Sequence, residues 1–132
     1  MGLLRWSIFC KADSDITAAS TPQDVPYGYI FNNCSISCAE NVTKVYLGRP
    51  WRDYGYTLFM NCQLPRQIRP EGWHHWQKER EQTARYLEYN NTGEGANISK
   101  RATWSRQLTK KEASKITLEA VFAINDIWEI ER

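Results

Sequence analysis

The segment Thr57-Leu58-Phe59-Met60-Asn61-Cys62-Gln63-Leu64 closely resembles Tyr29-Ile30-Phe31-Asn32-Asn33-Cys34-Ser35-Ile36, which lies 28 residues earlier. Both segments have the aromatic and aliphatic composition of β-strands. A strand-like unit that recurs at this period predicts one coil of a stack, in which each side chain lies on its counterpart in the next coil. The repeat therefore favours an all-β fold, a right-handed parallel β-helix with Phe and Cys stacked inside. Chance similarity of two short strands is the alternative.

Weaker echoes of the repeat occur on both sides of it, at Ile8-Phe9-Cys10 and at Leu87-Glu88-Tyr89-Asn90. The predicted strands are Ser7–Lys11, Ile16–Ser20, Tyr27–Ile36, Lys44–Leu47, Tyr56–Leu64 and Arg85–Tyr89. Leucine-rich and helical repeats are disfavoured, because the units are strand-like and lack the signatures of those repeats.

The chain changes character near its C-terminal end. Thr109 and Glu112 have the spacing of a helix capping box, in which each side chain binds the backbone N–H of the other residue. Apolar residues then recur at helical spacing, at Ala113, Ile116, Ala120 and Ile124. We expect a C-terminal helical segment that packs against the coil stack or caps its end.

Composition limits the classes of protein that fit. The chain has 132 residues and a net charge of +2 without a long run of one sign, which argues against a dedicated nucleic-acid binder. It has no apolar stretch of membrane-spanning length, so we expect no membrane partner. Met1–Ser7 is a poor signal peptide, because Arg5 interrupts its apolar residues and no small-residue cleavage site follows.

Neither the cysteines nor the histidines have the spacing of a metal site. Cys10, Cys34, Cys38 and Cys62 include no CxxC pair. We interpret them as small buried apolar residues, and a disulfide remains an open alternative. His74 and His75 are adjacent, so their rings diverge in regular structure, and no second ligand pair accompanies them. We expect no metal and no cofactor.

Val45-Tyr46-Leu47-Gly48-Arg49-Pro50-Trp51-Arg52 contains the residues most suggestive of a binding site. Arg49 and Trp51 are two positions apart, and such residues project to the same side of an extended segment. A guanidinium that can hold a carboxylate would then lie beside a flat ring that can cover a sugar. The alternatives are a surface arginine in a turn and a tryptophan in the core.

Taken together, these segments resemble the C-terminal half of the pectin methylesterases, also called pectinesterases, of carbohydrate esterase family 8. The similar segments, in the order that the family uses, are Ile16–Thr21, Gly28–Cys34, Leu47–Arg52, Thr57–Cys62, Pro70–Trp76, Glu88–Ala96 and Arg101. The resemblance implies a right-handed parallel β-helix with a cleft that binds pectin (homogalacturonan). It also implies a secreted or periplasmic location.

In this family an aspartate attacks the methyl-ester carbonyl of a galacturonate unit, and a second aspartate serves as general acid and then as base. Glutamines supply donors to the oxyanion. By resemblance, Arg49 is the catalytic-site arginine that holds the nucleophile, and Trp51 contacts the substrate. Trp73 and Trp76 line the cleft or, as we favour, pack in the interior.

The two aspartates and the glutamines lie well upstream of the arginine motif in the family. We expect no counterpart of the family's Gln-Asp pair or its Asp-Phe-x-Phe-Gly motif among the 48 residues before Arg49. Asp13 and Asp15 are acids near the start of the resemblance, but they match neither motif. The family's nucleophile role therefore does not pass to either of them.

We interpret residues 1–132 as a single partial pectinesterase domain without its N-terminal coils, with coils and side loops over 1–108 and the helix and tail over 109–132. A gene fragment, an incorrect gene start and an excised piece would look alike. We expect the chain to be inactive alone, although its family consists of enzymes. A noncatalytic pectin-binding module and a nonfunctional remnant are the alternatives. An exposed coil edge predicts self-association.

Overall fold

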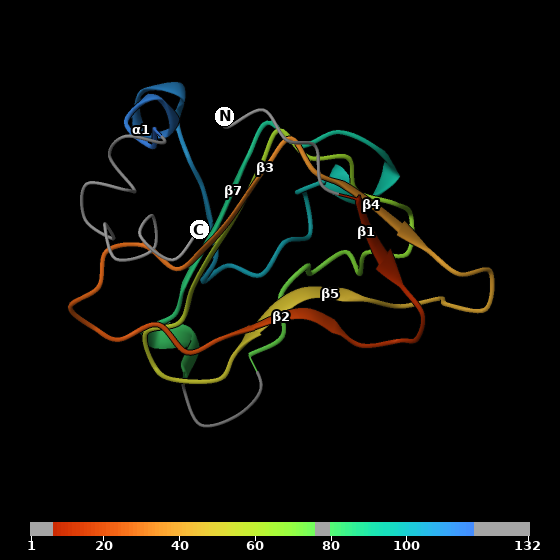
Figure 1. Cartoon of the computed structure of the whole chain (residues 1–132), viewed down its shortest axis with the longest axis horizontal. Coiled ribbons are helices and arrows are strands. Elements are labelled where there is room, and N and C mark those ends of the chain that lie inside the picture. The colour runs from red at the N-terminus through yellow and green to blue at the C-terminus, as the bar shows by residue number, and fades with distance from the viewer. Residues whose placement is uncertain (1–6, 76–79, 118–132) are drawn as a thin grey trace, which may run out of the picture.

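The computed structural model describes residues 7–75 and 80–117, and its strands lie in three parallel sheets (Figure 1). The first sheet pairs β1 (Ser7–Cys10) with β4 (Ser35–Cys38), and the second pairs β2 (Asp15–Ala19) with β5 (Tyr46–Pro50). The third contains β3 (Tyr29–Asn32), β6 (Tyr56–Met60), β7 (Arg85–Tyr89) and β8 (Arg106–Gln107). Two 3-10 helices (Arg80–Gln82 and Glu94–Ala96) and α1 (Lys110–Ser114) complete the elements.

Consecutive strands belong to different sheets, so the chain visits each sheet once before it returns to the first. One coil contains β1, β2 and β3, and the next contains β4, β5 and β6. Tyr29 pairs with Thr57, and Thr57 pairs in turn with Tyr86. The third coil also reaches the second sheet, where Gly48 forms a parallel bridge with Trp73. The fold is a parallel β-helix, as the repeat predicts.

Asparagines shape the same turn in successive coils. Asn33, Asn61 and Asn90 follow β3, β6 and β7 and have φ values of 62°, 54° and 52°. Asparagine tolerates this left-handed conformation better than most residues. Asn90 Nδ2 donates to Asn61 Oδ1 at 2.8 Å, and Asn61 Nδ2 donates to Asn32 Oδ1 at 3.0 Å. The turn at Asn33 divides the single strand expected over Tyr27–Ile36 into β3 and β4, so that expectation was wrong.

Aromatic rings and thiols from neighbouring coils stack in the interior. The ring centroids of Phe31 and Phe59 are 4.7 Å apart with the planes 13° from parallel, and those of Trp73 and Tyr86 are 4.4 Å apart. The Cys62 thiol donates to the Phe31 carbonyl at 3.4 Å. Burial raises the pKa of Cys62 to about 12, so this thiol stays protonated at neutral pH. All four cysteines are free, with Cys38 less buried than the other three.

A buried carboxylate connects the third coil to the loops that follow it. Glu88 is 1% exposed, and Arg101 Nε and Nη2 donate to its two oxygens at 2.8 and 2.9 Å. Trp73 Nε1 donates to the same carboxylate at 3.1 Å. Arg101 also donates to the carbonyls of Pro70 and Gly95. A buried charge is tolerated only when it is paired and hydrogen-bonded, so this network fixes the loops against the coils.

The predicted capping box is present at the start of α1. Thr109 Oγ1 accepts from Glu112 N at 3.1 Å, and Glu112 Oε1 accepts from Thr109 N at 3.0 Å. Ala113 is buried and Ile116 packs against the same apolar cluster. Ala120 and Ile124 lie outside the described residues. None of the helices in the described part of the chain has the length and apolar character that a membrane crossing requires.

We predict that Arg101→Ala lowers the free energy of unfolding by about 3–5 kcal/mol, because it leaves the Glu88 carboxylate buried without its cation. Arg106→Ala is the control, since Arg106 pairs with Glu112 at the surface. Urea unfolding followed by circular dichroism measures both. Equal effects of the two substitutions would contradict the structural importance of the Glu88 network.

Candidate functional site

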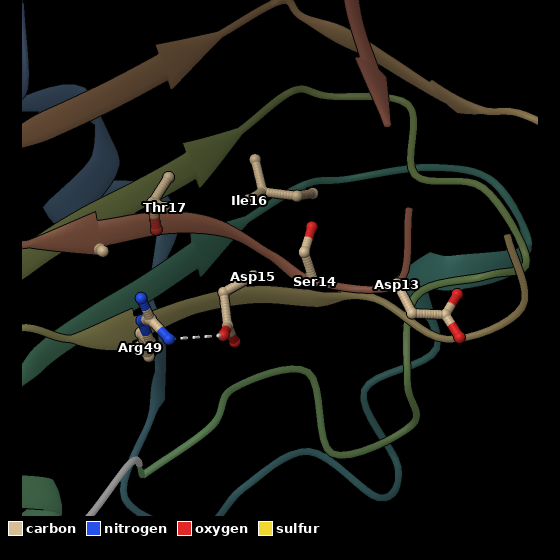
Figure 2. A pocket seen from close by; sticks show the side chains of 7 residues that line it. Asp13, Ser14, Asp15, Ile16, Thr17 and Arg49 are labelled. Carbon is tan, nitrogen blue, oxygen red and sulfur yellow. Dashed lines mark ion pairs between the residues drawn. The ribbon is translucent and has the colours of Figure 1, made fainter. Parts of the chain in front are cut away.

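Asp15 on β2 and Arg49 on β5 converge from neighbouring strands, as Figure 2 shows. Arg49 Nη1 lies 3.6 Å from Asp15 Oδ2, and His74 Nδ1 lies 3.6 Å from Asp15 Oδ1. The Asp15 side chain is 12% exposed, against 27% for Arg49 and 32% for His74. The carboxylate is therefore shielded from water, whereas its two partners reach the surface.

Gly48 allows the three coils to approach one another at this point. A Cβ at Gly48 would collide with Thr17 Oγ1 and would lie 3.2 Å from the Trp73 ring. Thr17 Oγ1 donates to the Leu47 carbonyl at 3.0 Å, and His74 N donates to the Gly48 carbonyl at 3.0 Å. The missing side chain thus lets the backbone segments that carry Asp15, Arg49 and His74 lie in adjacent coils.

A pocket of about 430 Å³ opens beside the Asp15–Arg49 pair (Figure 2). Its lining consists of Arg49 and the continuous segment from Asp13 through Ala18. The volume lies in the range of small-molecule binding sites. The pocket can therefore accept part of a ligand next to a carboxylate and a guanidinium.

The two aspartates of the pocket have pKa values shifted in opposite directions. Asp13 accepts hydrogen bonds from the backbone N–H groups of Thr43 at 2.9 Å and Lys44 at 3.2 Å, which hold the pKa of Asp13 below its ordinary value. Burial raises the pKa of Asp15, and the nearby His74 and Arg49 offset only part of that effect.

Trp51 follows β5 directly and is 43% exposed, so it is not a core residue. Arg49 Cζ lies 5.7 Å from the centre of its ring and Arg52 Cζ lies 6.0 Å from it, within the range of cation–π contacts. Trp51 N donates to the Ala19 carbonyl at 2.9 Å, which fixes the backbone of this turn. The guanidinium and the indole are neighbours, as their spacing predicts.

The structure assigns Trp73 to the interior, because it is 2% exposed and donates to Glu88. Trp76 lies outside the described residues. Within 7–75 and 80–117, no three His, Cys, Asp or Glu side chains are arranged to hold a metal ion.

Two features of the sequence were missed or misjudged. Gln23-Asp24 is a Gln-Asp dipeptide before Arg49, contrary to the expectation that none occurs there. It occupies an exposed turn in which Val25 N donates to the Pro22 carbonyl at 3.2 Å. Asp15 was set aside because it matches no motif, but its pairing with Arg49 depends on the coil register. The 31-residue step from Ala18 to Arg49 could have suggested it.

Comparisons with known proteins agree on one family. Residues 10–125 match the family model described as Pectinesterase. The probable pectinesterase/pectinesterase inhibitor 41 of Arabidopsis thaliana is 33% identical over 113 residues, which are 79% of this chain and 20% of that relative. This chain therefore spans about a fifth of that relative's length.

Solved structures of pectin methylesterases are also similar. One from Aspergillus niger has a TM-score of 0.69 and 32% identity, over 78% of this chain and 35% of that one. Another, in complex with hexasaccharide IV, has a TM-score of 0.63 and 26% identity, over 81% of this chain and 37% of that one. The chain spans little more than a third of these two structures.

We predict opposite pH dependences for Asp15→Asn and Asp13→Asn. A carboxyl whose pKa is raised by folding binds its proton more tightly in the folded state, so its contribution to stability falls as the pH rises through its titration range. The stability of the wild type relative to Asp15→Asn should therefore fall from pH 3 to pH 7. Relative to Asp13→Asn it should rise, because the pKa of Asp13 is lowered.

Urea unfolding at several pH values measures both differences, with each variant serving as the control for the other. A rise with pH in the Asp15 series would show that ion pairing, rather than burial, dominates at this carboxylate.

Proposed function

The chain belongs to the pectinesterase family, and we propose that it forms the downstream part of a pectin methylesterase domain. In this proposal it supplies Arg49 and Trp51 to a site that hydrolyses galacturonate methyl esters of pectin, which yields pectate and methanol. The supporting observation is the exposed Trp51 ring, 5.7 Å from the guanidinium of an arginine that lines a pocket. Export to the place where pectin occurs is part of the same proposal.

Arg49 would act on the attacking carboxylate of this reaction. A guanidinium beside a carboxylate keeps it ionised and holds it in one orientation, both of which a carboxylate nucleophile needs. The reaction also needs an acid that protonates the departing methoxide and donors that stabilise the oxyanion. We propose that these carboxylates and donors lie outside the 132 residues, because no Asp-Phe-x-Phe-Gly motif occurs in them.

Asp15 does not replace the missing nucleophile in this proposal. Its carboxylate is 12% exposed and lies between Arg49 and His74, each 3.6 Å away. Burial raises its pKa, which favours the neutral form, whereas the nucleophile has to be ionised and aimed at the ester carbonyl. We therefore propose that the chain is inactive by itself.

Trp51 would contact the sugar rings of the polymer. An exposed indole offers a broad apolar face, and its neighbours Arg49 and Arg52 offer positive charge to a polyanion. A similar protein has been solved in complex with a hexasaccharide, which supports a chain of sugars as the ligand. The same surface would serve a noncatalytic pectin-binding module, the second candidate function.

We predict that the purified chain binds methyl-esterified pectin without releasing methanol above the buffer level. Trp51→Ala should weaken binding about tenfold, because the ring that covers the sugar is lost. Tyr29→Ala is the control, since Tyr29 is also an exposed aromatic residue, on β3. Methanol turnover by the chain alone would overturn the assignment of the carboxylates, and binding unaffected by Trp51→Ala would remove Trp51 from the site.

Self-association through the first coil is a further part of the proposal. Among the described strands, β1, β2 and β3 each lie at the end of their sheet. Phe9 on β1 is 57% exposed and Tyr29 on β3 is 49% exposed. An open strand edge with exposed aromatic residues is a template for association with another strand.

We predict that the average mass of the chain in light scattering increases with concentration, and that Phe9→Lys reduces the increase. Ile98→Lys is the control, because Ile98 is similarly exposed but lies outside the first coil. A monomer at every concentration would contradict association through this edge.

A further inference from the structure

The pocket beside Asp15 carries more negative than positive charge. Asp13 and Asp15 contribute two carboxylates to its lining, and Arg49 contributes one guanidinium. The other lining residues, Ser14, Ile16, Thr17 and Ala18, are uncharged. Because Asp15 already pairs with Arg49 at 3.6 Å, an incoming carboxylate would meet a cation whose charge is largely balanced.

Fixed contacts hold both carboxylates at the pocket. Asp13 accepts from Thr43 N at 2.9 Å and from Lys44 N at 3.2 Å. Asp15 lies 3.6 Å from both Arg49 Nη1 and His74 Nδ1. Neither carboxylate can turn away from an incoming anion without giving up these contacts. Repulsion between like charges a few ångströms apart near a protein surface changes an affinity by about tenfold.

We propose that this pocket selects the methyl-esterified form of a galacturonate unit over the free acid, with Asp15 as the residue that determines the preference. The ester is uncharged and so avoids the repulsion that the free carboxylate meets from Asp13 and Asp15. This inference rests on the proposed function for its ligand class, and it adds which chemical form of the sugar enters this pocket.

Calorimetric titration tests the preference with two probes, a methyl-esterified hexagalacturonate and the fully de-esterified hexagalacturonate. At neutral pH and low ionic strength, where screening is weak, we expect the wild-type chain to bind the ester about tenfold more tightly. Asp15→Asn should bring the ratio of affinities close to one. It should do so by strengthening the binding of the free acid while leaving the binding of the ester unchanged.

Asp53→Asn is the matched control, because it changes the net charge by the same amount at an exposed aspartate that pairs with Arg80 outside the pocket. It should leave the wild-type preference intact. If Asp15→Asn does not fold, Asp13→Asn removes the other carboxylate of the pocket and should reduce the preference in the same direction.

Equal binding of the two probes by the wild type would overturn the inference. So would a preference that survives Asp15→Asn, or one that Asp53→Asn removes to the same extent. Binding of neither probe would overturn the proposed ligand class, and this inference with it. Binding of both probes without discrimination would overturn the inference alone.

Discussion

Hydrogen bonds between parallel strands of successive coils set the position of every other group described in this molecule. The strands of the third sheet follow one another at nearly the period of the sequence repeat, so Phe31 lies on Phe59. In the second sheet Ala18 pairs with Arg49, 31 residues further along. Register decides which side chains meet. The longer step therefore brings Asp15 to Arg49, although the two are remote in the sequence.

Local patterns predicted what depends on nearby residues. The repeat around Phe31 and Phe59 indicated the stacked coils, and the spacing of Thr109 and Glu112 indicated the helix cap. The pairing of Asp15 with Arg49 could not be derived in this way, because it depends on loop lengths between strands rather than on spacing within one. The left-handed turn at Asn33 and the two-residue strand β8 were also missed, since neither alters the apolar pattern.

The described coils combine rigid interior networks with a surface site of mixed charge. Glu88 is held by Arg101 and Trp73 in the interior, whereas Asp15 is held by two longer contacts beside a pocket. The first arrangement fixes loops, and the second leaves a carboxylate with a raised pKa where a ligand can reach its surroundings. This difference supports a binding and positioning role for the second site.

Nuclear Overhauser effects in solution test the coil register most directly, because they report which protons lie within a few ångströms of one another. The account predicts contacts between the backbone protons of Ala18 and Arg49, together with ring contacts between Phe31 and Phe59. A folded chain that lacks both sets of contacts, or that shows antiparallel contacts between β2 and β5, would contradict it.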